Sequence, residues 1–197
     1  MPVMPTLERV FCRSAPWGVF AGRVVLPWAL AGAALEGRVL EIGSGGGTMA
    51  AQLLTTHPGI TLTAVDPDPA MVVASARRLA SFGDRVSVRK GDATGLPFAD
   101  GTFDAVVSFL MLHHVVAWEK ALAEAARVLR PDGLLIGYDL LDTGPARSFH
   151  RAEGAQVRLA TVDGLRRVVG ALPFRTPEVR RRLGGYAVTF SAYRAGP

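Results

Sequence analysis

Cysteine and long hydrophobic runs are nearly absent from this sequence of 197 residues. The single cysteine, Cys12, cannot form a disulfide within the chain, which fits a reducing compartment and leads us to expect a cytoplasmic protein. Charged residues, glycine or proline interrupt every apolar run well before the roughly 18 residues that a membrane-spanning helix requires. No charged segment followed by an apolar run opens the chain, so we expect neither a membrane span nor a secretory signal.

Lysine is also scarce. Only Lys90 and Lys120 occur, so arginine supplies nearly all of the positive charge, and the formal net charge is +5. Such a charge is compatible with nucleic-acid binding. The arginines are scattered, however, with short runs at residues 166–167 and 180–182, so we favour a compositional bias over a nucleic-acid partner. The content of 49% hydrophobic residues argues against a disordered chain, and the length is typical of one domain.

Strand and helix patterns alternate from Arg38 onward. The predicted strands are residues 38–42, 60–65, 86–89, 103–108 and 134–138, and the predicted helices are residues 48–56, 69–82 and 118–129. Asp68 is predicted as the N-cap of the second helix, with Pro69 at its first position, and residues 130–133 are predicted as a turn. This alternation predicts an α/β fold in which helices cover both faces of a parallel sheet. Gly184 and Gly185 form a good hairpin turn, so the last two strands are expected to be antiparallel to each other.

Two segments differ from this pattern. Residues 1–37 are treated as an N-terminal helical lid segment, with a helix predicted over residues 24–35, and residues 38–197 as the core domain. The aromatic residues of the first segment either form a lid over a ligand or pack its helix onto the sheet; they are Phe11, Trp17, Phe20 and Trp28. Residues 143–160 are predicted as a loop that varies with the substrate. Its arginines either bind a carboxylate or phosphate or are solvated; they are Arg147, Arg151 and Arg158.

A glycine-rich loop, E-I-G-S-G-G-G at residues 41–47, separates the first strand from its helix. Glycines allow a left-handed backbone and a close approach of a ligand, and ligands of open α/β sheets bind at the carboxyl ends of the strands. The loop is not the dinucleotide fingerprint, because Thr48 occupies the position of the last glycine. It is not a Walker loop either, since it contains no lysine.

An acidic residue ends each of the next two strands. Asp66 can accept hydrogen bonds from a ribose diol, or it is a turn residue before Pro67. Asp92 can accept a hydrogen bond from an adenine amine, or it belongs to an ordinary turn. Because both acids and the glycine loop follow successive strands, we expect them to meet at one edge of the sheet.

At these residues the chain resembles the class I S-adenosylmethionine-dependent methyltransferases of the small-molecule type, and is similar to the ubiquinone/menaquinone C-methyltransferase-like group. The resemblance covers residues 38–137, about half of the chain. The matching stretches are VLEIGSGGG, AVDPDPAM, GDATGLPFADGTFDAVVS, LHHV and ALAEAARVLRPDGLL. It implies a Rossmann-like sheet of seven strands with the last strand antiparallel. It also implies S-adenosylmethionine as cofactor, S-adenosylhomocysteine as product and a small-molecule acceptor, and leaves a homodimer open.

The resemblance further implies roles for individual residues. Glu41 orients the glycine loop or meets the ammonium group of the cofactor, and Asp66 binds the ribose hydroxyls. Asp92 and Ala93 read the adenine edge. The other implied cofactor-binding residues are Gly43, Ser44, Gly45 and Gly47 around the methionine part, Pro67 and Met71 beside the adenine, and Ser108 and Phe109 near the methyl donor.

His113 and His114 are the candidate catalytic residues, because an imidazole just past the fourth strand can remove a proton from a hydroxyl or an acidic carbon. The alternative is that each histidine merely packs or caps the following helix. Asp139 and Asp142 are candidate metal ligands, but no acidic residue follows the fourth strand to complete a catechol-type site, so we expect no metal.

Other methyltransferase classes fit less well. The sequence lacks the motifs of DNA amine, cytosine-C5 and protein-arginine methylation. An RNA or protein methyltransferase and a non-catalytic S-adenosylmethionine-binding protein stay open as alternatives, whereas a nicotinamide dehydrogenase is disfavoured by Thr48.

Overall fold

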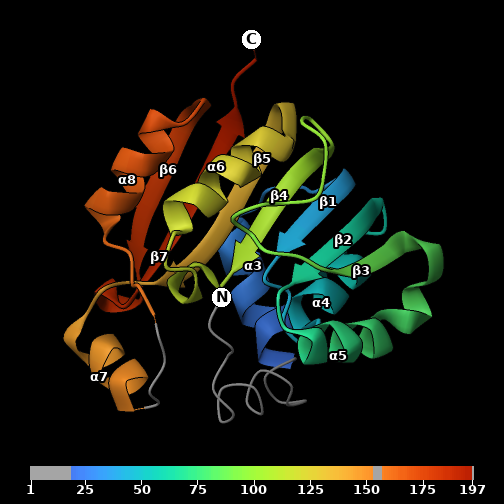
Figure 1. Ribbon diagram of the computed structural model, residues 1–197, viewed down its shortest axis with the longest axis horizontal. Helices are drawn as coiled ribbons and strands as arrows, with labels where there is room; N and C mark the ends of the chain where they lie inside the picture. Colours follow the sequence, from blue (N-terminus) through green and yellow to red (C-terminus); the bar gives the residue numbers. More distant parts are fainter. Residues whose placement is uncertain (1–18, 153–156, 197) are drawn as a thin grey trace.

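The computed structural model describes residues 19–152 and 157–196. They form a sheet of seven strands in the order β3-β2-β1-β4-β5-β7-β6 (Figure 1). The strands are β1 Gly37–Ile42, β2 Ile60–Asp66, β3 Val86–Lys90, β4 Phe103–Phe109, β5 Leu129–Leu140, β6 Phe174–Arg182 and β7 Ala187–Arg194. The first five strands are parallel, and β7 is antiparallel to both β5 and β6. The expected α/β fold with an antiparallel last strand is confirmed.

Helices pack on both faces of this sheet, and each face has its own hydrophobic cluster. One cluster includes residues of α3, α4 and α5, and the other includes residues of α6 and α8. The helices are α3 Leu26–Leu30, α4 Thr48–Thr56, α5 Pro69–Leu79, α6 Trp118–Val128, α7 Gly144–Ala152 and α8 Val162–Ala171. Figure 1 shows α7 at the lower left, apart from the two layers. Within the described residues, no helix combines the length and apolarity needed to span a membrane.

The start of α5 shows how local chemistry sets these boundaries. The side chain of Asp68 accepts a hydrogen bond from the backbone N–H of Ala70 at 2.8 Å, and Pro69 occupies the first turn, where its missing N–H leaves no bond unmade. Asp68 is thus the N-cap of α5, and Pro69 is the first residue of the helix. This cap fixes where α5 begins, just after β2 ends at Asp66.

Three sequence predictions need correction. The first helical segment is not residues 24–35: a π-helical turn, Ala21–Val25, precedes α3, which ends at Ala31 because that residue adopts a left-handed φ of 50°. Residues 143–160 are not all loop, since they contain α7. The turn predicted at residues 130–133 is an irregularity within β5, where the pairing with β4 shifts register and Asp132 has a φ of 63°.

Of the segment predicted as a lid, residues 1–37, the structure describes only residues 19–37. Phe11 and Trp17 lie outside the described residues. Trp28 packs edge-to-face on Tyr138 of β5, with ring centroids 5.3 Å apart, whereas Phe20 is half exposed. In the described part of the segment, Trp28 therefore packs its helix onto the sheet.

Candidate active site

Backbone hydrogen bonds join the carboxyl ends of neighbouring strands. The N–H groups of Gly43 and Ser44 donate to the carbonyl of Val65 at 2.8 and 3.0 Å. The N–H of Gly91 donates to the carbonyl of Asp66 at 3.1 Å. These bonds hold the loops after β1, β2 and β3 side by side. The residues singled out in those loops therefore share one edge of the sheet, as expected.

The glycine loop has a left-handed backbone at three positions, with φ of 71°, 51° and 77° at Gly43, Gly45 and Gly47. A Cβ on Gly43 would lie 2.7 Å from the side chain of Met111, and one on Gly47 would lie 2.7 Å from Oγ of Ser75. A Cβ on Gly45 would meet no atom of the described residues within 4 Å. Two of the three glycines thus make room for the protein's own side chains, and only Gly45 borders open space.

Asp66 ties the glycine loop to the end of β2. One carboxylate oxygen accepts a hydrogen bond from the N–H of Gly45 at 2.8 Å, and the other accepts one from the N–H of Asp68 at 2.9 Å. Burial raises the pKa of Asp66, although these two bonds act in the opposite direction. Each oxygen has a second lone pair, so the carboxylate can still accept hydrogen bonds from a diol.

Glu41 is the most perturbed acid of the site. Its side chain is 2% exposed, and its Oε2 atom has no hydrogen-bond partner within the described part of the chain. Burial, and secondarily the charge of Asp66, raises the pKa of Glu41 to about 8. A buried carboxyl group left without a partner is costly, and a cationic ligand would relieve that cost.

Two hydroxyl groups at the same strand ends share this lack of partners. The Oγ atoms of Ser44, after β1, and Ser108, in β4, are buried and make no hydrogen bond to the described residues. Ser108 is paired in register with Ile42, the last residue of β1. Glu41, Ser44 and Ser108 thus carry buried polar atoms at adjacent strand ends that no described residue satisfies, and a polar ligand would satisfy them.

The residues expected at the adenine differ in exposure. Asp92 is exposed, and its carboxylate accepts hydrogen bonds from the N–H and hydroxyl of Thr94, both at 2.8 Å. Ala93 and Met71 are buried, and Pro67 is half-buried. Ala93 packs into the hydrophobic cluster on the α6 face. The geometry brings these residues to the expected edge, and their contact with an adenine stays a prediction.

Phe109 lies at the end of β4 in an aromatic group. Its ring centroid is 5.8 Å from that of Tyr138 in β5, and Tyr138 in turn contacts Trp28 of α3. All three side chains belong to the hydrophobic cluster of the α3 face or pack against it. This aromatic group therefore lies on the α3 face of the sheet, whereas the side chain of the preceding residue, Ser108, points to the opposite face.

His113 is oriented by a carboxylate. Its Nδ1 atom lies 2.5 Å from Oδ1 of Asp139, and both side chains are buried. The backbone N–H groups of Leu112 and Leu140 also donate to this carboxylate, each at 2.6 Å. The second candidate, His114, is buried as well, and its ring centroid lies 4.0 Å from that of His113. Both histidines therefore belong to the same edge as the acids.

Two residues that contact the candidate histidines, Asp139 and His150, were not predicted as catalytic from the sequence. Asp139 was considered only as a metal ligand, although adjacent parallel strands place the end of β5 beside the end of β4. His150, from α7, is buried, and its ring centroid is 5.1 Å from His113 and 6.1 Å from His114. Nothing in the sequence pattern signals this contact, because it depends on where α7 folds back.

The two residues considered as metal ligands, Asp139 and Asp142, make other contacts. Asp139 holds His113, and Asp142 pairs with Arg147 at 2.7 Å. Among the described residues, no group of three or more histidine, cysteine, aspartate or glutamate side chains is arranged to hold a metal ion.

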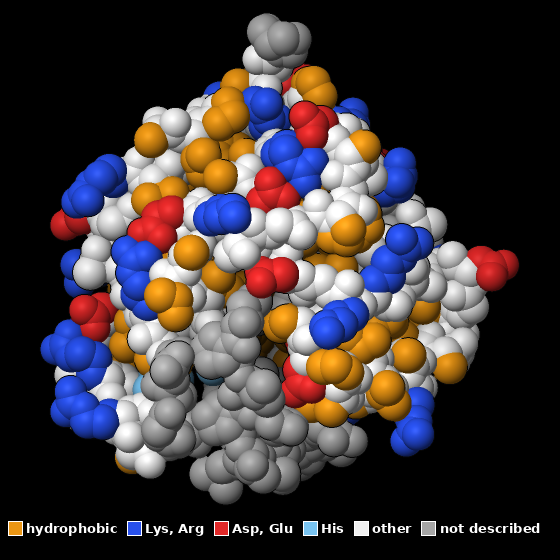
Figure 2. All heavy atoms as spheres, viewed as in Figure 1, with side chains coloured by type: hydrophobic (Ala, Val, Ile, Leu, Met, Phe, Trp, Pro, Cys, Tyr) orange, Lys and Arg blue, Asp and Glu red, His pale blue; other side chains and the backbone are white. Residues whose placement is uncertain are grey.

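Two of the three arginines considered as anion contacts in residues 143–160 form ion pairs, Arg147 with Asp142 and Arg158 with Glu119. The guanidinium of Arg158 forms a bidentate ion pair with Glu119, at 2.5 and 2.6 Å. The backbone N–H of Arg158 donates to the carbonyl of His113 at 2.8 Å. On the face shown in Figure 2, basic side chains are scattered among acidic and apolar ones.

Comparison with known proteins agrees with this geometry. Residues 40–137 match the family model described as a methyltransferase domain. The demethylmenaquinone methyltransferase of Thermus thermophilus is 36% identical over 99 residues, which are 50% of this chain and 45% of that protein. The malonyl-[acyl-carrier protein] O-methyltransferase of Geobacter sulfurreducens is 30% identical over 154 residues, which are 72% of this chain and 57% of that protein. This chain thus spans about half the length of the curated relatives it matches.

A solved structure shows the same fold. Haemonchus contortus phosphoethanolamine N-methyltransferase 2, in complex with S-adenosyl-L-methionine, aligns with a TM-score of 0.74 at 16% identity. The alignment covers 89% of this chain and 52% of that chain. At this identity the likeness concerns the fold alone.

Proposed function

The chain belongs to the methyltransferase domain family, and from that premise we propose that it transfers a methyl group from S-adenosylmethionine to a small-molecule acceptor. The class I resemblance, based on the glycine loop and the acids that follow it, is confirmed by the family match over residues 40–137. The identity of the acceptor goes beyond that match and rests on the site itself.

The observation that carries the proposal is the buried, unpartnered carboxyl group of Glu41 beside Asp66. S-adenosylmethionine would supply an electrophilic methyl group together with an ammonium group and a ribose diol. Glu41 suits the ammonium group, because ionising this side chain next to a cation relieves its burial cost. Asp66 suits the diol, and the open space at Gly45 allows a ligand to approach the backbone.

The acceptor side of the site favours a nucleophile that must lose a proton. The carboxylate of Asp139 accepts a hydrogen bond from Nδ1 of His113, which leaves Nε2 as the basic nitrogen of that ring. A base in this position can remove a proton from a hydroxyl group or an acidic carbon. The protein otherwise acts by positioning, since the cofactor carries the reactive group.

The acceptor class is suggested by the names of the relatives, because demethylmenaquinone methyltransferases are named for a quinone-derived acceptor. We therefore propose a hydroxylated aromatic ring of the quinol type as the acceptor class, methylated at carbon or oxygen.

The test is a methyl-transfer assay with methyl-tritiated S-adenosylmethionine and four acceptors: a naphthoquinol, a catechol, a primary arylamine and a short RNA. We expect label in the naphthoquinol or the catechol, and loss of that transfer in His113→Gln. Label in RNA alone would contradict the small-molecule proposal. Binding of S-adenosylhomocysteine without transfer to any acceptor would favour a non-catalytic protein. A parallel titration with NAD is expected to show no binding.

A further inference from the structure

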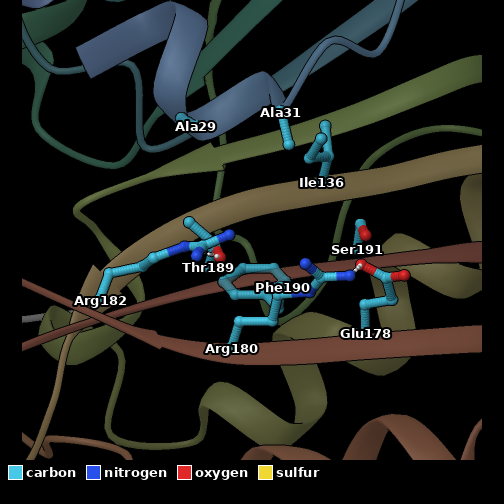
Figure 3. A pocket seen from close by; sticks show the side chains of 9 residues that line it. All are labelled: Ala29, Ala31, Ile136, Glu178, Arg180, Arg182, Thr189, Phe190 and Ser191. Atoms are coloured by element: carbon cyan, nitrogen blue, oxygen red, sulfur yellow. Dashed lines mark hydrogen bonds and ion pairs between the residues drawn. The ribbon is translucent and has the colours of Figure 1, made fainter. Parts of the chain in front are cut away.

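A cavity of about 310 Å³ lies between α3 and the last strands of the sheet (Figure 3). On this face α3 packs against β5 through Trp28 and Tyr138. Helix α8 packs on β6 from the opposite face of the sheet. Val179 of β6 belongs to the hydrophobic cluster on that face. Within the described residues, no helix covers β7 and β6 on the α3 face, and the cavity occupies this region.

The two walls of the cavity differ in chemistry. Ala29 and Ala31 from the end of α3, together with Ile136 of β5, form an apolar wall. The opposite wall is mostly polar, with Phe190 as its apolar member. Figure 3 shows Glu178, Arg180 and Arg182 on that side. These three alternate residues share one face of β6, because successive side chains of a strand point to opposite faces.

Arg182 has unused hydrogen-bonding capacity. It is half-buried, and its Nε donates to Oγ1 of Thr189 at 3.3 Å. Among the described residues, Thr189 is the only hydrogen-bond partner of the Arg182 side chain, and no carboxylate forms an ion pair with it. A guanidinium has five N–H donors in a planar fork that matches carboxylate and phosphate groups. A half-buried fork held by one neutral hydroxyl therefore suits an incoming anion.

Arg180 adds a second positive charge that is weakly held. It pairs with Glu178 at 3.0 Å, but both side chains are more than half exposed. Exposed ion pairs of this kind contribute little to stability, so a ligand anion can compete for the arginine. With one acid and two arginines, this wall carries a net positive charge.

The arginine end of the cavity lies at the functional edge of the sheet. Arg182 is paired in register with Ala187, which also pairs with Leu140, the residue after Asp139. Thr189 is paired with Tyr138, whose ring contacts Phe109 at the end of β4. A ligand held by Arg182 would thus extend from the same edge that carries the proposed site of methyl transfer.

We propose that this cavity binds the carboxylate or phosphate group of an amphiphilic acceptor, with Arg182 as the principal anion ligand and Arg180 as the second. The apolar wall contacts the hydrocarbon next to the anion. This inference rests on the proposed methyl transfer for the role of the ligand, but the binding itself is measured without any transfer.

The experiment is calorimetric titration of the full chain with octyl phosphate, octanoate, inorganic phosphate and octan-1-ol. We expect octyl phosphate or octanoate to bind, and octan-1-ol and inorganic phosphate each to bind at least about tenfold more weakly, because a charged hydrogen-bonded anion and an apolar contact are both needed. Equal binding of octan-1-ol would overturn the anion site. Equal binding of inorganic phosphate would overturn the amphiphilic ligand.

Three variants locate the site. Arg182→Gln is expected to weaken octyl phosphate binding by about tenfold or more, and Arg180→Gln by a smaller factor. Arg181→Gln is the matched control, since it removes the same charge from the same strand on the opposite face. Equal weakening by Arg181→Gln would overturn the proposal. Arg182→Lys keeps the charge and is expected to retain part of the binding.

Binding of S-adenosylhomocysteine is expected to be unchanged in all of these variants, which also reports on their folding. If octyl phosphate binds as described but no acceptor is methylated, the proposed function fails and the anion site stands. If an acceptor is methylated while Arg182→Gln leaves octyl phosphate binding unchanged, the anion site fails and the proposed function stands.

Discussion

The Nδ1 atom of His113, just past β4, lies 2.5 Å from Oδ1 of Asp139 in β5, and the pair is buried from solvent. Two backbone N–H groups also donate to the same carboxylate, so Asp139 is held in place by the strand ends themselves. An aspartate fixed in this way selects the tautomer of His113 with the proton on Nδ1 and stabilises the imidazolium that forms when the ring accepts a second proton.

Substitution of either His113 or Asp139 is expected to slow methyl transfer. His113→Gln is expected to lower kcat by about 10²–10⁴-fold, the contribution typical of a positioned general base. Asp139→Asn is expected to lower kcat and to displace the pH dependence of the rate, because the amide no longer stabilises the charged ring. The measurement is the pH profile of kcat with the acceptor identified in the transfer assay.

His114→Gln serves as the comparison, since His114 is the neighbouring imidazole, with ring centroids 4.0 Å apart. If His113→Gln and His114→Gln both retain full turnover, neither histidine is the base. A loss confined to His114→Gln would assign the role to that residue instead.

Asp66 predicts an effect on cofactor binding. Asp66→Ala is expected to weaken S-adenosylhomocysteine binding by roughly 1.5–3 kcal/mol, the range for hydrogen bonds to a charged group. The same change also removes the acceptor for the N–H groups of Gly45 and Asp68, so some loss of stability is expected. Titration calorimetry on Asp66→Ala and Asp66→Asn, with thermal unfolding of each, separates the two effects. Unchanged affinity in Asp66→Ala would remove Asp66 from the site.

Features of the fold that depend on neighbouring residues were predictable from the sequence. The helix at residues 48–56 and the Asp68 cap of α5 were predicted in place, because their signals lie within one turn. The first helix was misplaced, because apolar spacing continues to Leu35, which is buried, whereas the helix stops at the left-handed Ala31. Apolar periodicity records burial and does not by itself report where a helix ends.

For the site as well, only the features that follow from strand order could be predicted from the sequence. The strand-end acids follow from strand order, and the resemblance supplied their roles. The contact of His113 with His150 was not predictable, because it joins segments 37 positions apart through the fold of α7. Nor does the sequence say that Met111 fills the space beside Gly43.

Replacement by alanine is expected to lower the stability of the fold more at Gly43 than at Gly45. Both have positive φ, so alanine at either position is expected to cost roughly 1–2 kcal/mol of stability. Gly43→Ala also brings a Cβ to 2.7 Å from Met111, and this overlap is expected to cost about 1–3 kcal/mol more. Denaturant unfolding of the two variants measures the difference. Equal stabilities would mean that Met111 moves aside without cost.

Glu41 predicts a pH dependence of stability. Its pKa is about 8 in the folded chain and near 4.5 when unfolded, so between these values the folded state holds a proton that the unfolded state has lost. Stability from this group is therefore fully present below pH 4.5, declines by at most about 1.4 kcal/mol per pH unit as the pH rises, and is constant above pH 8. Glu41→Gln stays neutral and is expected to show no such decline. The measurement is the difference in unfolding free energy between the two proteins from pH 5 to pH 9, and a constant difference would contradict the prediction.

The same carboxyl group links cofactor binding to proton release. An ammonium group beside Glu41 favours the ionised form, so binding of S-adenosylhomocysteine below pH 8 is expected to expel a proton and to tighten by up to about tenfold per pH unit toward pH 8. Calorimetry in two buffers of different ionisation enthalpy counts the protons released. Glu41→Gln is expected to release none and to bind more weakly at pH 8. If the unmodified chain releases no proton at pH 7, Glu41 does not meet the ammonium group, and its role is confined to orienting the glycine loop.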